Sequence, residues 1–265
     1  MYVVAIAELN TTIEAEAAAL SSDLGISAYE TRMVLASGTP TIVSMTFDKA
    51  RALDLLARLR SRGHGAIACD DAAVVASDAM TSMRRFGLGP ESISSDDGAG
   101  PKLPYDDVVA LVAAVHRQRT TSESEVRDSK FSAARAVLSG GIVTTKTVKR
   151  ETRAITEERE AVLYVFRRGG GAPWILRERG TRWAGHGRLI APTAGANFRT
   201  TVGLLRERMP RAVYDDRLVA RKSAPERIAV AGGSAGTTMT TSSEAGIDLL
   251  AHLLAIWISR AHSDR

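Results

Sequence analysis

The first 70 residues alternate between short apolar runs and segments whose apolar residues recur at helical spacing. The apolar runs predict strands at 2–9, 41–47 and 66–69, and the amphipathic segments predict helices at 13–24, 27–36 and 49–62. Ser27 followed by Glu30 forms a capping box, and Asp48 is placed as the N-cap of the third helix. The order strand, helix, helix, strand, helix, strand predicts a small α+β sandwich over residues 1–77.

The clearest hairpin pattern lies between residues 160 and 187. Two apolar runs, Ala161–Phe166 and Pro173–Leu176, are separated by two arginines and three consecutive glycines, which allow the backbone to reverse. A third short strand is expected around Thr181–Ala184. Upstream, 80–88 and 92–94 are weaker strand candidates, and the apolar run 108–115 follows them.

The C-terminal part predicts a helix at 197–209 with Asn197 as its N-cap, and a strand at 226–231. A Gly-, Ser- and Thr-rich stretch then leads to a second capping box, Thr241 with Glu244, and to a final helix at 245–261. This helix is apolar around most of its circumference, so we expect it to be buried. It either seals a barrel or forms a homo-oligomer interface through Leu250, Leu254 and Trp257.

Charge divides the chain unevenly. Residues 1–78 carry 6 Lys and Arg against 10 Asp and Glu, whereas residues 117–198 carry 16 against 8. The asymmetry indicates two units with different electrostatic roles, unless it reflects only the drift of an Arg- and Ala-rich sequence. Residues 117–159 are polar and basic, and we expect them to form a mobile insertion.

The N-terminal region, residues 1–76, resembles the C-terminal domain of the bacterial ribosomal stalk protein and the related ClpS adaptor. Both have a helix hairpin, a Gly-Pro turn, a strand and a long amphipathic helix in this order. The residues that carry the resemblance are Glu30, Gly38, Pro40, Val43, Asp48, Ala52, Leu55, Leu56 and Gly63. The resemblance implies a binding module without naming its ligand.

A second resemblance rests on Pro104, Tyr105, Asp107 and Val109, which follow two weak strands. This phrase is similar to the entry of bacterial pleckstrin-homology-like and GRAM-like domains. The resemblance implies that residues 78–265 form an antiparallel β-barrel closed by helices. The expected fold class is therefore α+β, a small sandwich followed by a pleckstrin-homology-like barrel.

Composition adds limits on compartment and class. A 45% hydrophobic and 25% charged content is that of a globular protein with a core. The single cysteine, Cys69, excludes an intramolecular disulfide. The N-terminus lacks the basic region of a signal peptide, and no apolar run reaches the length of a membrane span. We therefore expect a cytoplasmic protein.

The sharpest motif is Gly232-Gly233-Ser234-Ala235-Gly236, which satisfies the G-x-S-x-G nucleophile elbow and resembles that of hormone-sensitive-lipase-type esterases. A hydrolase with Ser234 as nucleophile needs an acid and a base later in the chain, and Asp248 and His252 lie only one helical turn apart. The catalytic interpretation is therefore an alternative, and no catalytic residue is assigned in the favoured one.

The remaining candidates concern metals and anions. The five histidines are scattered without zinc-ligand spacing, so neither a metal nor another cofactor is expected. The best candidate for a functional surface is a cluster of arginines that would form a basic barrel edge: Arg167, Arg168, Arg177, Arg179, Arg182 and Arg188. Such an edge fits lipid headgroups or nucleic acid, or is simply solvated.

Taken together, these patterns favour a non-enzymatic cytoplasmic adaptor or regulatory protein that acts through protein–protein contacts. A serine hydrolase and a protein that binds anionic lipid or nucleic acid are the alternatives. The identity of the protein partner is left open.

Overall fold

A computed structural model describes the chain except for residues 132–144, 184–189, 222–223, 234–235 and 264–265; the side chains of 124–152, 232–236 and 262–265 are also outside the described part. Its contacts divide the chain into two units. The first comprises Met1–His116, Glu160–Pro225 and Ser243–Arg265, and the second comprises Arg117–Arg159 and Glu226–Ser242.

The N-terminal elements follow the predicted order. They are β1 (Tyr2–Glu8), α1 (Ile13–Leu24), α2 (Ala28–Leu35), β2 (Thr41–Thr46), α3 (Lys49–Ser61) and β3 (Gly65–Asp70). The three strands form an antiparallel sheet in the order β2-β1-β3. Both expected caps are confirmed: Ser27 and Glu30 bond reciprocally, and the Asp48 carboxylate accepts the N–H groups of Ala50 and Arg51.

Both faces of this small sheet are buried, which explains why β1 is apolar without alternation. Val4 and Ile6 pack with the helices α1–α3, whereas Val3 and Ala5 pack with the C-terminal helix α6 (Glu244–Ser263). Because α6 also packs on the strands that follow residue 108, the small sheet and these later strands share one core. The expected boundary at residue 77 therefore does not separate two independent cores.

A second small sheet follows. It is antiparallel, in the order β5-β6-β7, and consists of β5 (Phe86–Leu88), β6 (Ser92–Ser95) and β7 (Lys102–Pro104). The strand expected at 92–94 is confirmed. The one expected at 80–88 is two separate strands, β4 (Thr81–Ser82) and β5, because β4 joins a different sheet.

The larger sheet of the first unit is built on β8 (Val108–Phe131), β9 (Thr145–Arg167), β10 (Trp174–Arg177) and β11 (Val213–Leu218). The predicted hairpin is confirmed: β9 and β10 pair antiparallel, and all three glycines between them have positive φ. Thr181–Trp183 form no strand, and Ala184 lies outside the described residues.

This sheet is a curled half barrel, and the protein has an α+β fold. The expectation of a purely antiparallel barrel is wrong, because β4 pairs with β10 and β11 pairs with β8 in parallel. A tight hairpin can join only antiparallel neighbours, and parallel neighbours need a longer connection. β4 and β11 are far in sequence from the strands with which they pair.

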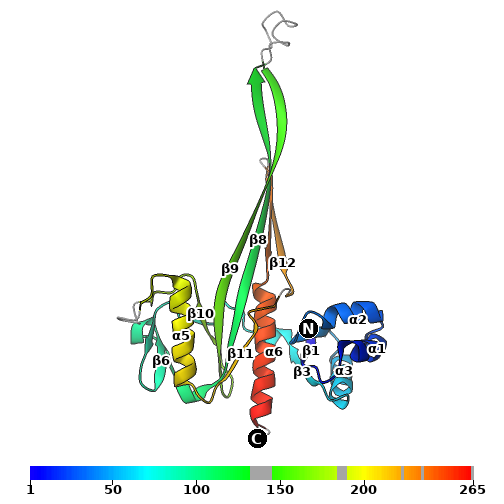
Figure 1. Ribbon diagram of the computed structural model, residues 1–265, viewed down its shortest axis with the longest axis vertical. Helices are drawn as coiled ribbons and strands as arrows, with labels where there is room; N and C mark the ends of the chain where they lie inside the picture. The colour runs from blue at the N-terminus through cyan, green and yellow to red at the C-terminus, as the bar shows by residue number, and fades with distance from the viewer. Residues whose placement is uncertain (132–144, 184–189, 222–223, 234–235, 264–265) are drawn as a thin grey trace, which may run out of the picture. The chain divides into compact units, whose positions relative to one another are not determined.

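Two helices cover opposite faces of the β8–β9 pair (Figure 1). Leu163 and Val165 face α5 (Ala194–Arg208), whereas Val162 and Tyr164 face α6. Burial on both faces accounts for the continuous apolar runs in these strands. Among the described helices, none combines the length and hydropathy that a membrane span requires.

Two of the predicted helix caps are wrong. Thr193, not Asn197, caps α5, and the buried Asn197 side chain instead bonds both backbone groups of Ala191. The final helix begins at Glu244, after the Ser243 carbonyl accepts its first backbone bond, while Thr241 lies in a strand. Asn197 is thus used by the loop six residues before it, and Thr241 by the pairing of β13 with β8.

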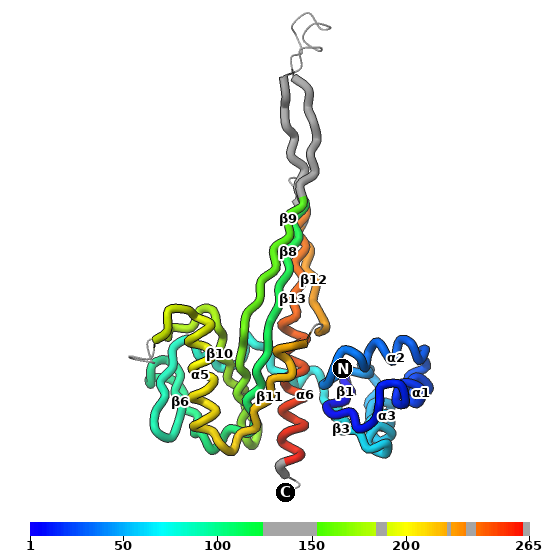
Figure 2. Tube along the Cα trace, in the orientation of Figure 1, coloured from blue at the N-terminus to red at the C-terminus, as the bar shows by residue number. Residues whose placement is uncertain are grey.

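The second unit is a sheet of long strands in the order β12-β13-β8-β9 (Figure 2). β12 (Arg227–Gly233) and β13 (Gly236–Ser242) pair antiparallel, and β13 pairs antiparallel with β8 between Gln118 and Ser124. The predicted strand at 226–231 is thus confirmed. The stretch expected to lead without a strand into the last helix forms β13 instead. The predicted mobility of 117–159 remains a prediction.

Candidate functional site

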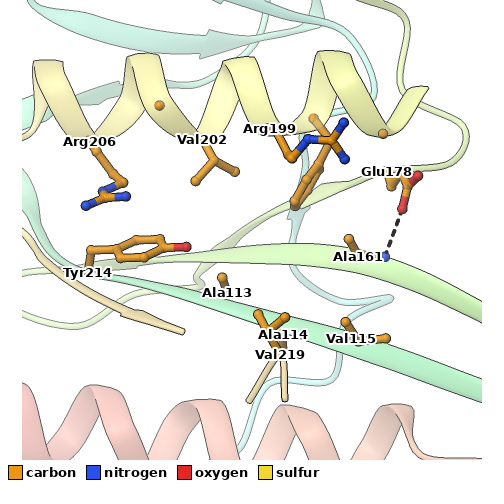
Figure 3. Close-up of a pocket in the computed structure, with 13 residues that line it drawn as sticks. Ala113, Ala114, Val115, Ala161, Glu178, Arg199, Val202, Arg206, Tyr214 and Val219 are labelled. Carbon is orange, nitrogen blue, oxygen red and sulfur yellow. Dashed lines mark hydrogen bonds between the residues drawn. The ribbon is translucent and has the colours of Figure 1, made fainter. Parts of the chain in front are cut away.

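A pocket of about 420 Å³ lies between α5 and the strands β8 and β9 of the first unit (Figure 3). Its lining is largely apolar, with Phe198 and Val202 of α5 on one side and Ala113 and Val115 of β8 on the other. This volume lies in the range of about 300–1,000 Å³ that is typical of ligand-binding pockets.

Small residues keep the pocket open. Ala113 and Ala161 present only a methyl group from the two strands, and Gly203 presents none from the helix. A Cβ added at Gly203 would meet no atom within 4 Å, so empty space lies directly beside this turn of α5. The pocket therefore follows from side-chain size at a few positions.

Charged and aromatic side chains mark the two ends of the pocket. Arg199 and Arg206 lie seven residues apart on α5, which places them two turns and about 10 Å from one another along the helix. The Arg206 guanidinium carbon lies 4.1 Å from the centre of the Tyr214 ring, a cation–π contact. The two guanidinium groups give the rim a positive charge at each end.

One acidic side chain also lines the pocket, but it is engaged by the sheet. The Glu178 Oε2 atom accepts the backbone N–H of Ala161 at 3.3 Å, and the Glu178 N–H bonds the Ala161 carbonyl (Figure 3). The carboxylate thus continues the hairpin pairing beyond the end of β10. Arg199 and Arg206 are therefore more exposed than Glu178 at the rim of the pocket.

A buried chain of polar groups lies on the opposite face of the β8–β9 pair. Asp248 of α6 accepts the Tyr164 hydroxyl at 2.6 Å and the Ser77 hydroxyl at 2.5 Å, and its other oxygen accepts the Ser77 N–H at 2.8 Å. The Tyr164 hydroxyl is 2.6 Å from His116 Nε2. All four residues are buried. The chain links the segment after β3 to α6 and to both central strands.

Two histidines complete this region in their neutral form. Burial lowers the pKa of His116, although the carboxylates of Glu244 and Asp248 act to raise it. The Nδ1 atom of His116 has no hydrogen-bond partner among the described residues. Burial likewise lowers the pKa of His252, whose Nε2 accepts the Val75 N–H at 3.2 Å. Burial and then Asp248 raise the pKa of Tyr164 well above its usual value. Buried and mutually bonded, these groups hold segments together.

The structure does not gather the predicted arginines on one edge. Arg177 pairs with Glu160 at 3.1 Å and also with Glu244. Arg177 lies opposite Val162 in the hairpin, and Arg167 lies five residues further along β9, toward the turn. β10 ends at Arg177, so Arg179 lies beyond the end of this strand. Of the remaining members, Arg168 follows Arg167 in the chain and its side chain bonds the Asp106 carbonyl, and the Arg182 N–H bonds the Arg84 carbonyl. Arg188 lies outside the described residues.

The alternative nucleophile, Ser234, also lies outside the described residues. The segments on either side of it are two antiparallel strands, whereas a nucleophile elbow joins a strand to a helix. Its proposed partners are engaged in the first unit, Asp248 with Ser77 and Tyr164, and His252 with Val75. Within the described part of the chain, no group of His, Cys, Asp and Glu has the arrangement of a metal site.

The predicted interface residues belong to the chain's own core. Leu250 and Leu254 are fully buried and pack with the two sheets. Trp257 is half-buried and lies against β3, where a Cβ on Gly65 would be 2.7 Å from its ring. Leu250 and Leu254 are therefore covered by the chain's own strands, and the interface through Trp257 stays a prediction.

Compared with known proteins, the chain matches no family model, no curated protein and no solved structure. The pocket must accordingly be interpreted from its own chemistry. Its key residues, Arg199, Gly203 and Arg206, were not singled out from the sequence. The signal that could have identified them is a glycine inside a helix whose neighbours Val202 and Leu205 face inward.

Proposed function

We propose that this protein is a non-enzymatic adaptor or regulatory protein, and that the pocket beneath α5 receives a segment of its protein partner. The observation that carries the proposal is an open apolar pocket with a guanidinium group at each end. Apolar pockets with a few convergent polar groups are the usual form of a recognition site. The two arginines indicate that acidic residues flank the apolar side chain of the partner.

The partner segment that fits presents an apolar side chain between two acidic residues. The apolar side chain enters the space beside Gly203, and each carboxylate meets Arg199 or Arg206. Because the arginines are about 10 Å apart along the helix and an extended chain advances about 3.3 Å per residue, the acidic residues stand about three positions apart.

The test is selection from a displayed library of short random peptides by the purified full chain. We expect enrichment of apolar residues flanked by Asp or Glu. Gly203→Leu fills the pocket and should reduce binding of selected peptides at least about tenfold, because it removes the space for the anchor side chain. Arg199→Glu combined with Arg206→Glu should shift selection toward Lys- and Arg-flanked peptides.

Matched controls separate pocket recognition from general charge. Arg32→Glu combined with Arg51→Glu makes the same change in net charge on exposed positions of α2 and α3, and should leave the selected sequences unchanged. Enrichment without apolar-acidic preference, or equal binding by Gly203→Leu, would show that the pocket is not the recognition site. No observation favours a second function: of the predicted basic edge, Arg177 pairs with Glu160, and Arg167 lies near the opposite end of the β9–β10 hairpin.

The finer fold and location assignments are part of the same proposal. The pleckstrin-homology-like interpretation is supported by the position of Pro104 and Tyr105 directly before β8, and by the helix that packs on the curled sheet. The ClpS-like interpretation is supported by the element order β1 to β3. We place the protein in the cytoplasm on its single, unpaired cysteine.

A further inference from the structure

The second unit ends in an open edge strand. β12 is the outermost strand of the order β12-β13-β8-β9, and no other described strand pairs with its far side (Figure 2). It pairs with β13 from Arg227 to Gly233 without a shift in register, so it contains no bulge. In such a strand, alternate residues direct their N–H and C=O groups outward, where another strand can pair with them.

The interior of β12 lacks the features that usually protect an edge, and its one charged residue, Arg227, stands at its first position. Natural edges carry lysine, proline, bulges or inward-pointing charges, whereas the interior of this strand is Ile228, Ala229, Val230 and Ala231. Ile228 and Val230 are 66% and 67% exposed, and Met239, directly opposite Val230 on β13, is 39% exposed. An apolar strip therefore runs along an unprotected edge.

We propose that β12 pairs antiparallel with β12 of a second copy of the chain, about a two-fold axis at Val230. The strand is complementary to itself in this register. Val230 lies opposite Val230, Ile228 lies opposite Gly232, and the exposed strips of the two copies continue one another on the same face of the joined sheet. Each bulky residue thus meets an equal partner or a glycine.

Charge and register favour this occupant over an unrelated strand. Arg227 of each copy lies opposite Gly233, so the pairing places no like charges face to face. A slip of one residue would put Ile228 opposite Ala231 and would join the apolar strip of one copy to the alanine face of the other. The register centred on Val230 keeps Ile228 and Val230 of both copies on one face of the joined sheet.

Sedimentation velocity of the full chain over a concentration series tests the proposal, and its outcome is independent of peptide binding in the α5 pocket. We expect the wild-type chain to dimerise. Val230→Lys and Val230→Glu alone should each raise the dissociation constant at least about tenfold, because two like charges then lie directly opposite. Mixing the two variants should restore association as a heterodimer.

Ala229→Lys is the matched control, since it adds the same charge on the other face of β12 and opposite Ala231 rather than itself. It should weaken association less than Val230→Lys does. Circular dichroism of each variant should match the wild type, because residue 230 is exposed in the isolated chain. A wild-type chain that stays monomeric, or Lys and Glu variants that fail to associate on mixing, would overturn the proposal.

Discussion

Removing the Tyr164 hydroxyl is the sharpest test of how the first unit is held together. Tyr164→Phe keeps the ring that packs beside Phe166 and deletes one oxygen atom that contacts both Asp248 and His116 at 2.6 Å. Asp248 keeps its two bonds to Ser77, but His116 then loses its hydrogen-bond partner in a buried site. The substitution therefore acts on hydrogen bonding with little change in packed volume.

The expected cost follows from these contacts. A hydrogen bond to a charged group contributes about 1.5–3 kcal/mol, and a buried polar group left unpaired adds about 1–3 kcal/mol, so we expect a loss of about 2–4 kcal/mol after partial relaxation. Urea unfolding followed by tryptophan fluorescence measures the change. Tyr29→Phe deletes the same atom from a side chain that is 64% exposed, and should change the free energy of unfolding by less than about 0.5 kcal/mol.

A double-mutant cycle with Asp248→Asn completes the test. The two changes should be non-additive by at least about 0.5 kcal/mol, because Tyr164 and Asp248 share one hydrogen bond. If Tyr164→Phe proves as mild as Tyr29→Phe, the buried chain does not hold β9 to α6, and the reasoning from this network fails.

Three further outcomes follow from individual side chains. Burial lowers the folded-state pKa of His116 and His252, so their contribution to stability is complete above the unfolded pKa of 6.5 and is lost as pH falls below that value. Urea unfolding from about pH 7.5 to about pH 5.5 should show this loss of stability. His252→Gln should reduce the dependence of the unfolding free energy on pH. Burial and Asp71 raise the pKa of Cys69 to about 11, so labelling by a thiol reagent at neutral pH should be much slower than in the unfolded chain. Gly203→Ala should raise the free energy of unfolding by about 0.5–1 kcal/mol, measured in the same urea assay, because its Cβ meets nothing within 4 Å.

Local signals in the N-terminal region were sufficient to predict its elements. The Ser27–Glu30 box and the Asp48 cap are satisfied by neighbours within three residues, so no distant contact competes with them. The caps assigned to Asn197 and Thr241 are wrong because each of these residues has a partner outside its own helix. Asn197 bonds the backbone of a preceding loop. Thr241 of β13 lies opposite Arg119 of β8, more than one hundred residues earlier in the chain.

The candidate site depended on long-range arrangement and was therefore not predicted. The six arginines are close in sequence, but the β9–β10 register separates Arg167 from Arg177 and gives the latter to Glu160 and Glu244. Arg199 and Arg206 look like ordinary solvent-facing charges on an amphipathic helix. They border a pocket only because β8 and β9 present alanines beneath them.

The glycine at position 203 gives a physical reason to regard the pocket as more than a packing defect. In a helix interior glycine is less stable than alanine by about 1 kcal/mol, and here no neighbouring atom requires the missing side chain. At Gly195, in contrast, a Cβ would lie 2.9 Å from Glu178 Oε1, so packing accounts for that glycine. Stability alone would favour a larger residue at 203, which would also close the space beside the helix. A position that lowers stability, and whose enlargement would fill an apolar pocket between two arginines, is accounted for if an incoming side chain occupies that space.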